Sequence, residues 1–105
     1  MAPQQDSMPI PDRVRLVIAL TEVNSRYLRG ENRCAGAEIE LACALACEKR
    51  EGTTPDRARD IVQLRARLDA SEIELLAIEA ERDWLENELA NFDTAESSKK
   101  PGEWQ

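Results

Sequence analysis

Hydrophobic residues recur every three or four positions along most of the chain, which is the spacing of amphipathic α-helices. The pattern predicts helices over about residues 11–29, 32–50 and 55–92. Ala, Leu, Glu and Arg dominate the composition, and these strong helix formers leave few candidates for strands. The chain is therefore expected to be all-α, a small three-helix bundle with a long C-terminal coiled-coil-like third helix.

The predicted helix ends depend on a few punctuating residues. Pro11 suits a first helical turn, and Gly30 suits the end of the first helix. Gly52 can end the second helix, and Thr54 with Pro55 can begin the third. The first two helices, joined by a tight turn, are expected to pack antiparallel against the first half of the third.

The third predicted helix, over residues 55–92, spans about 38 residues or roughly 57 Å. A break at Ser71 is an alternative, because the segment SEIE has the form of a capping box. A continuous helix is favoured, since no Gly or Pro is present there to reverse the chain. Residues 11–93 would form one domain between two flexible polar tails, residues 1–10 and 94–105.

Two apolar stripes run along this third helix. The first is a heptad seam made of Ile61, Leu64, Leu68, Ser71, Leu75, Ile78, Arg82, Leu85, Leu89 and Phe92. The second lies on the side away from the seam and consists of Ile73, Leu76, Ala80 and Trp84. The first half of the seam is expected to face the chain's own bundle, whereas the second half and the second stripe require another cover.

Charges beside the seam favour an antiparallel partner. Arg65 and Arg67 flank its first half and glutamates flank its second, so a parallel dimer would place acid beside acid. An antiparallel pair brings Arg65 near Glu86 and places Ser71 and Arg82 in the same layer. We therefore expect an antiparallel homodimer through the third helix; a foreign partner on the same face and a compact monomer remain alternatives. The predicted interface residues are Leu68, Leu75, Ile78, Arg82, Leu85, Leu89, Phe92, Leu76 and Trp84.

Net charge and composition narrow the class of partner and the compartment. The chain carries a net charge of -7 and no His, which excludes imidazole chemistry and makes direct binding to nucleic acid unexpected. Long apolar runs and an export signal are lacking, and the three cysteines fit poorly with a secreted disulfide framework. A cytoplasmic protein without membrane contact is expected, with protein partners that present a basic surface.

Candidate chemistry is sparse. Cys43 and Cys47 are one helical turn apart and could share a metal ion, but zinc prefers four ligands, and three cysteines in an Ala-rich helix are expected to act as small hydrophobes. The sequence contains no EF-hand loop and no glycine-rich phosphate loop. We expect no catalytic residues, no metal and no cofactor, and hence a protein that is not an enzyme.

An acidic block occupies the second half of the third predicted helix. Between Glu72 and Glu96 there are nine acids and a single base, Arg82. Such a block is usually a solvated helix face, but it could also imitate a phosphate backbone and fill a basic groove. In this respect the chain is similar, as a class, to small acidic helical phage proteins that inhibit host defence, including anti-CRISPR proteins. The alternative function is thus an inhibitor of a nucleic-acid-binding partner, acting through Glu72, Glu74, Glu79, Glu81, Asp83, Glu86 and Glu88.

Overall fold

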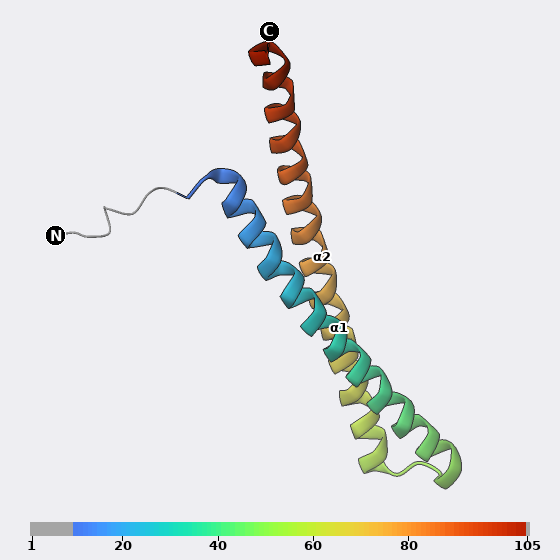
Figure 1. Ribbon diagram of the computed structural model, residues 1–105. Helices are drawn as coiled ribbons and strands as arrows, with labels where there is room; N and C mark the ends of the chain where they lie inside the picture. Colours follow the sequence, from blue (N-terminus) through green and yellow to red (C-terminus); the bar gives the residue numbers. More distant parts are fainter. Residues whose placement is uncertain (1–9, 105) are drawn as a thin grey trace, which may run out of the picture. The chain divides into compact units, whose positions relative to one another are not determined.

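The computed structural model describes residues 10–104, with side chains for residues 10–96. Two long helices and the short turn between them make up the chain from residue 12 to residue 104 (Figure 1). Helix α1 is Asp12–Glu51, with 40 residues, and helix α2 is Pro55–Trp104, with 50 residues. The described chain is therefore an all-helical hairpin.

The prediction of a three-helix bundle is wrong, because α1 continues through the expected stop at Gly30. A glycine that ends a helix takes a positive φ, and among the described residues only Gly52 has one, at 86°. Gly30 is instead buried within α1. A Cβ atom added to it would lie 3.0 Å from Cδ1 of Leu75 and 3.6 Å from Cδ1 of Ile78. The glycine therefore permits close approach of the helices and does not turn the chain.

The true turn combines several stop and start signals in four residues. The Gly52 amide donates a hydrogen bond to the Glu48 carbonyl at 2.8 Å and closes α1. Thr54 caps α2, since its Oγ1 accepts a 3.0 Å hydrogen bond from the Arg57 amide, and Pro55 takes the first helical position. The Arg57 guanidinium also donates to the Gly52 carbonyl, which ties the start of α2 to the end of α1. The predicted start of the last helix is thus confirmed.

Helix α2 is unbroken at Ser71, as the continuous-helix prediction required, and it extends past Phe92 to Trp104. The last turns of α2 thus occupy most of the segment expected to be a C-terminal tail. Residues 1–9 of the expected N-terminal tail lie outside the described residues.

The hairpin divides into two units, which we treat separately. The turn unit contains residues 25–80, and the end unit contains residues 10–24 and 81–104 of the described chain. Four apolar side chains are buried in the turn unit, namely Ala37, Leu41, Ile61 and Ile78. Val23 and Leu85 are buried in the end unit. Each unit therefore has a narrow core confined to the contact between its two helical segments.

Candidate interaction surface

Two ion pairs define the register of the helices in the turn unit. Arg33 Nη2 lies 2.8 Å from Glu74 Oε1, and Arg67 Nη1 lies 2.6 Å from Glu40 Oε1. The two residue numbers add up to 107 in both pairs, so the segments run antiparallel without a shift along this length. All four side chains are about half-exposed, so these pairs select the register but add little to stability.

Mostly small residues of α1 face mostly large residues of α2 across the turn unit. The inward positions of α1 are Tyr27, Gly30, Cys34, Ala37, Leu41 and Ala44, all buried or half-buried. The inward positions of α2 are Ile61, Leu64, Leu68, Ser71, Leu75 and Ile78, also buried or half-buried. Small side chains allow close helix packing, as the 3.0 Å approach of Leu75 to the position of a Gly30 Cβ illustrates. In this unit, then, α1 covers the heptad seam that the sequence assigned to α2.

Tyr27 joins the two helices at the edge of the seam. Its hydroxyl donates a 3.2 Å hydrogen bond to Glu79 Oε2. Partial burial of the ring and the hydrogen bond to Glu79 raise the pKa of Tyr27, and the negative charges of Glu31 and Glu79 act in the same direction. A phenolate at this position would face carboxylates, so the neutral hydroxyl form is favoured.

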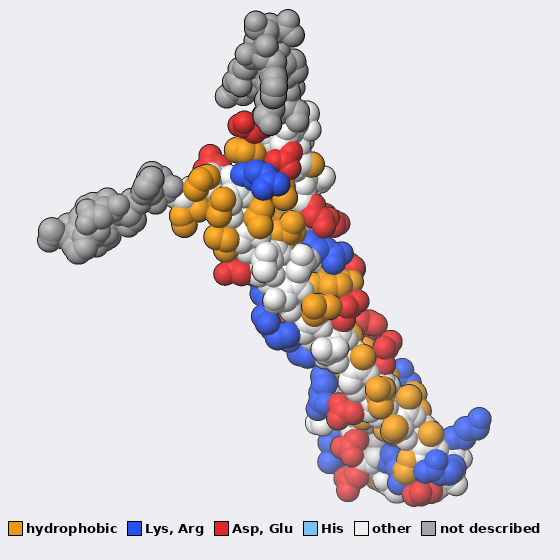
Figure 2. Space-filling view, in the orientation of Figure 1, with side chains coloured by type: hydrophobic (Ala, Val, Ile, Leu, Met, Phe, Trp, Pro, Cys, Tyr) orange, Lys and Arg blue, Asp and Glu red, His pale blue; other side chains and the backbone are white. Residues whose placement is uncertain are grey.

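An exposed apolar row follows the opposite side of α2 in the turn unit, and we call it the outer face of α2. Its members recur at helical spacing: Val62, Ala66, Ala70, Ile73, Leu76, Ala77 and Ala80. The exposed fractions of its three large residues are 66% for Val62, 68% for Ile73 and 64% for Leu76. Figure 2 shows hydrophobic side chains beside charged ones on the visible surface of the hairpin. The outer face includes three of the four residues of the predicted second stripe.

Charge is unevenly distributed along the part of α2 that lies in the turn unit. Residues 59–69 contain three Arg and two Asp, a net charge of +1, whereas residues 70–80 contain three Glu, a net charge of -3. Two of the predicted acidic residues are already held by α1: Glu74 pairs with Arg33, and Glu79 accepts the Tyr27 hydrogen bond. Glu72 is exposed, and with Leu75, Leu76 and Glu79 it lines a shallow depression at one edge of the outer face.

The end unit holds the remaining predicted interface residues. Leu85 is buried, Arg82, Leu89 and Phe92 are half-buried, and Trp84 is 59% exposed. Arg13 Nε lies 2.8 Å from Asp93 Oδ1, and this hydrogen-bonded pair raises the pKa of Arg13. Of the predicted acidic residues in this unit, Glu81, Asp83 and Glu86 are exposed and Glu88 is half-buried.

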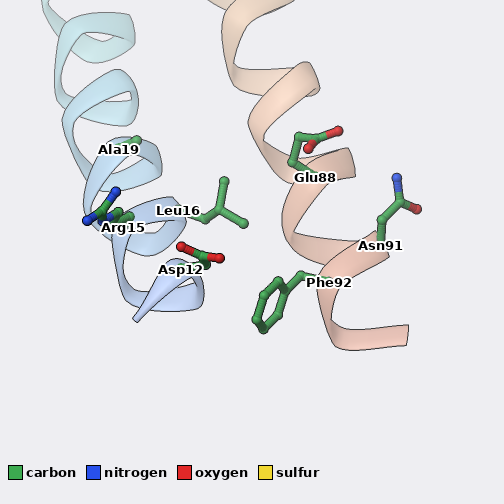
Figure 3. A pocket seen from close by; sticks show the side chains of 7 residues that line it. All are labelled: Asp12, Arg15, Leu16, Ala19, Glu88, Asn91 and Phe92. Atoms are coloured by element: carbon green, nitrogen blue, oxygen red, sulfur yellow. The ribbon is translucent and has the colours of Figure 1, made fainter. Parts of the chain in front are cut away.

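An open groove of about 590 Å³ lies between the helical segments of the end unit (Figure 3). It is lined by Asp12, Arg15, Leu16, Ala19, Glu88, Asn91 and Phe92. Leu16 from α1 and Phe92 from α2 project into the space between the helices. The lining combines two carboxylates, one guanidinium and two large apolar side chains. Such a mixed surface suits contact with a side chain of a partner better than it suits acid-base catalysis.

The cysteines behave as parts of the helix surfaces. All three are free thiols, with Cys34 and Cys47 half-buried and Cys43 exposed. Burial raises the pKa of the Cys34 thiol, and the carboxylates of Glu72 and Glu38 raise it further. Because the thiolate is both the nucleophile and the metal ligand, Cys34 is poorly suited to either role. Within residues 10–96, no three His, Cys, Asp or Glu side chains are grouped so that they could hold a metal ion.

Comparison with protein-family models, with curated proteins and with solved structures gave no match for this chain. Within the described part of the chain, neither helix has a stretch long and apolar enough to cross a lipid bilayer. A functional assignment therefore has to come from the surfaces of the hairpin.

Proposed function

We propose that this chain is a non-catalytic interaction protein that works by helix-to-helix contact through the outer face of α2. The observation that carries the proposal is the exposure of Val62, Ile73 and Leu76 on a helix whose other side is already packed against α1. Scattered exposed aliphatic residues are common, but a continuous row at helical spacing is typical of a contact surface.

The free energy that a partner could gain by covering the outer face is substantial compared with the contribution of the small core of the turn unit. Four apolar side chains are buried in the turn unit. Covering a large aliphatic side chain stabilises an association by about 1.5–3 kcal/mol, before the entropic cost of binding is subtracted. Val62, Ile73 and Leu76 contribute little of this energy while they face water, so a partner on the outer face would gain most of it.

In the turn unit, α1 already occupies the side of α2 on which the homodimer was expected. The seam residues Leu68, Leu75 and Ile78 pack toward α1 in the folded turn unit, so a second α2 could reach them only after the hairpin opened. Leu76 is accessible without any such opening. We therefore propose that a partner, a second copy included, makes its contact on the outer face.

A double substitution distinguishes a contact surface from a part of the hairpin core. Replacing Ile73 and Leu76 by Ser should leave the free energy of unfolding in dilute solution within about 0.5 kcal/mol of wild type, because exposed positions contribute little. Urea unfolding followed by circular dichroism measures this quantity. The matched control, Ile78→Ser, should lose more than about 2 kcal/mol, because Ile78 is 7% exposed. A comparable loss in the double variant would contradict the proposal.

An acidic inhibitor of a nucleic-acid-binding protein is the second candidate. Exposed Glu72 in the turn unit and exposed Asp83 and Glu86 in the end unit support it, whereas Glu74 and Glu79 are already engaged with α1. Salt dependence separates the candidates. An association made by exposed charges weakens steeply as salt is added, whereas an apolar contact is insensitive or becomes stronger.

A further inference from the structure

We infer that the thiols of Cys43 and Cys47 form a binding site for one copper(I) ion on the surface of α1. The inference is independent of the outer face of α2 and of the function proposed for that face. Three observations carry it: the position of the two cysteines one helical turn apart, the accessibility of their thiols, and the engagement of the neighbouring carboxylates with arginine side chains of α2.

The spacing of the two cysteines suits a bridging metal ion better than a disulfide bond. Both lie within α1, and residues four apart on a helix have Cβ atoms about 5–6 Å apart on the same side. A disulfide needs about 3.5–4.5 Å between its Cβ atoms, so an intact helix does not bring Cys43 and Cys47 close enough for one. A metal–thiolate bond is about 2.3 Å long. One ion held between two sulfur atoms therefore separates them by up to about 4.6 Å, which the helical spacing accommodates.

Solvent reaches the pair from two sides. Both thiols are free, and Cys43 is exposed while Cys47 is half-buried. An open hollow of about 330 Å³ adjoins Cys47, and its lining also includes Ala44, Thr54, Asp56, Arg57 and Asp60. A metal ion on the pair is thus accessible, so copper can be delivered and removed by exchange with a thiol of another molecule.

The carboxylates about one turn before and one turn after the pair are engaged with α2. Glu40 lies 2.6 Å from Arg67, and Glu51 lies 3.3 Å from Arg57. In the part of the chain with described side chains, no third His, Cys, Asp or Glu joins the two cysteines in a group that could hold a metal ion. The site therefore offers two sulfur ligands.

Two sulfur ligands favour copper(I) over the other metal ions that proteins commonly hold. Zinc in structural sites prefers four ligands, calcium takes six or more oxygen atoms, and iron–sulfur clusters use four cysteines. Thiolates are soft ligands that select copper(I), an ion that is stable with two of them. Binding replaces two S–H bonds by two Cu–S bonds and releases two protons to the solvent. Copper enters and leaves as copper(I), so the step needs no oxidant or reductant.

Competition with a coloured copper(I) chelator tests the inference. Full-length reduced protein, titrated without oxygen against the copper(I) complex of bathocuproine disulfonate, should take up one copper ion per chain. Cys43→Ala and Cys47→Ala should each raise the dissociation constant by at least about 100-fold, because linking two ligands in one site adds that much affinity. Cys34→Ala is the matched control. Its thiol lies more than two turns away and faces α2, so its loss should change the constant by less than about threefold.

Exchanging two neighbouring residues tests the spacing itself. Ala42→Cys combined with Cys43→Ala keeps the composition and an exposed thiol. It moves that thiol from about 40° to about 140° around the helix axis from Cys47, so it should bind copper no better than Cys43→Ala alone. Alanine is a strong helix former, and circular dichroism should show wild-type helicity in every variant.

Four results would overturn the inference. They are a dissociation constant within about threefold of wild type in Cys43→Ala or Cys47→Ala, an equal loss in Cys34→Ala, wild-type affinity in the exchanged variant, and a native mass spectrum in which copper bridges two chains. None of them bears on the urea experiment with Ile73 and Leu76, which tests the proposed function separately.

Discussion

Two glycines in α1 allow the close packing of the turn unit to be measured by the same substitution at two sites. Gly30 is buried against α2, where an added Cβ would lie 3.0 Å from Cδ1 of Leu75. Gly36 is exposed, and an added Cβ would meet nothing within 4 Å. Both lie inside the same helix, so replacing either by Ala should bring the same gain in helix propensity.

The expected changes in the free energy of unfolding differ because only the substitution at Gly30 creates a crowded contact, with Leu75. Alanine is preferred over glycine inside a helix by about 0.5–1 kcal/mol, and Gly36→Ala should stabilise the protein by that amount. At Gly30 the same gain is opposed by the displacement of the Leu75 methyl, the free end of a half-buried side chain. Mild overpacking costs about 1 kcal/mol, so Gly30→Ala should be close to neutral and about 1 kcal/mol less stable than Gly36→Ala.

Urea unfolding in dilute solution, followed by circular dichroism, measures both free energies on the same scale. The difference between the two variants cancels the common propensity term and leaves the cost of crowding at Gly30. Equal stabilisation by both substitutions would refute the reasoning, since it would mean that α1 and α2 do not approach closely at Gly30.

Three further predictions follow from burial and from the perturbed pKa values. Ile78→Ala should lower the free energy of unfolding by about 2–5 kcal/mol and Ile73→Ala by less than about 0.5 kcal/mol in urea unfolding of the dilute protein, because only Ile78 is buried. The pKa of Tyr27 is raised above its ordinary value of 10.0, so the stability it contributes is complete below about pH 10 and is lost as the pH rises through the folded pKa. Ultraviolet titration of this single tyrosine should give a higher pKa in the native protein than in urea, and equal values would disprove the contact. Cys34 should react with a thiol reagent more slowly than exposed Cys43, as measured by peptide mass spectrometry, and faster reaction at Cys34 would contradict its assigned environment.

The sequence was sufficient to place the start of α2 and its continuity. Gly52, Thr54 and Pro55 give three consistent signals within four residues, and each is used in the structure. The segment around Ser71 contains no residue that could reverse the chain, and α2 passes through it. Predictions were accurate where several local preferences agreed.

Gly30 misled the prediction because glycine serves two purposes that look alike in a sequence. It can end a helix in the left-handed conformation, or it can let a neighbouring helix approach. The signal that distinguishes them was present: Tyr27, Gly30, Cys34 and Ala37 keep the spacing of one helical face across the expected turn. A real turn would have interrupted this phase.

The same error shifted the expected contact surface. Helix α1 has 40 residues, about twice the length expected for the first helix. It therefore covers seam residues of the turn unit, such as Leu75 and Ile78, that were expected to require a partner. The second stripe could be identified from spacing alone, and Leu76 and Ile73 are indeed exposed. Which of the two stripes stays exposed to solvent depends on how α1 packs against α2. Helical periodicity alone does not specify this packing.

Protection of a thiol on the outer face of α2 tests the central claim most directly. Ala70→Cys places a small reactive group on the outer face of α2, and native Cys43, exposed on α1, provides an internal reference in the same chain. The rate of alkylation at position 70 should fall as the protein concentration rises, while the rate at Cys43 stays constant. Rates at both positions that do not depend on concentration would show that no second copy covers the outer face, and would contradict the account.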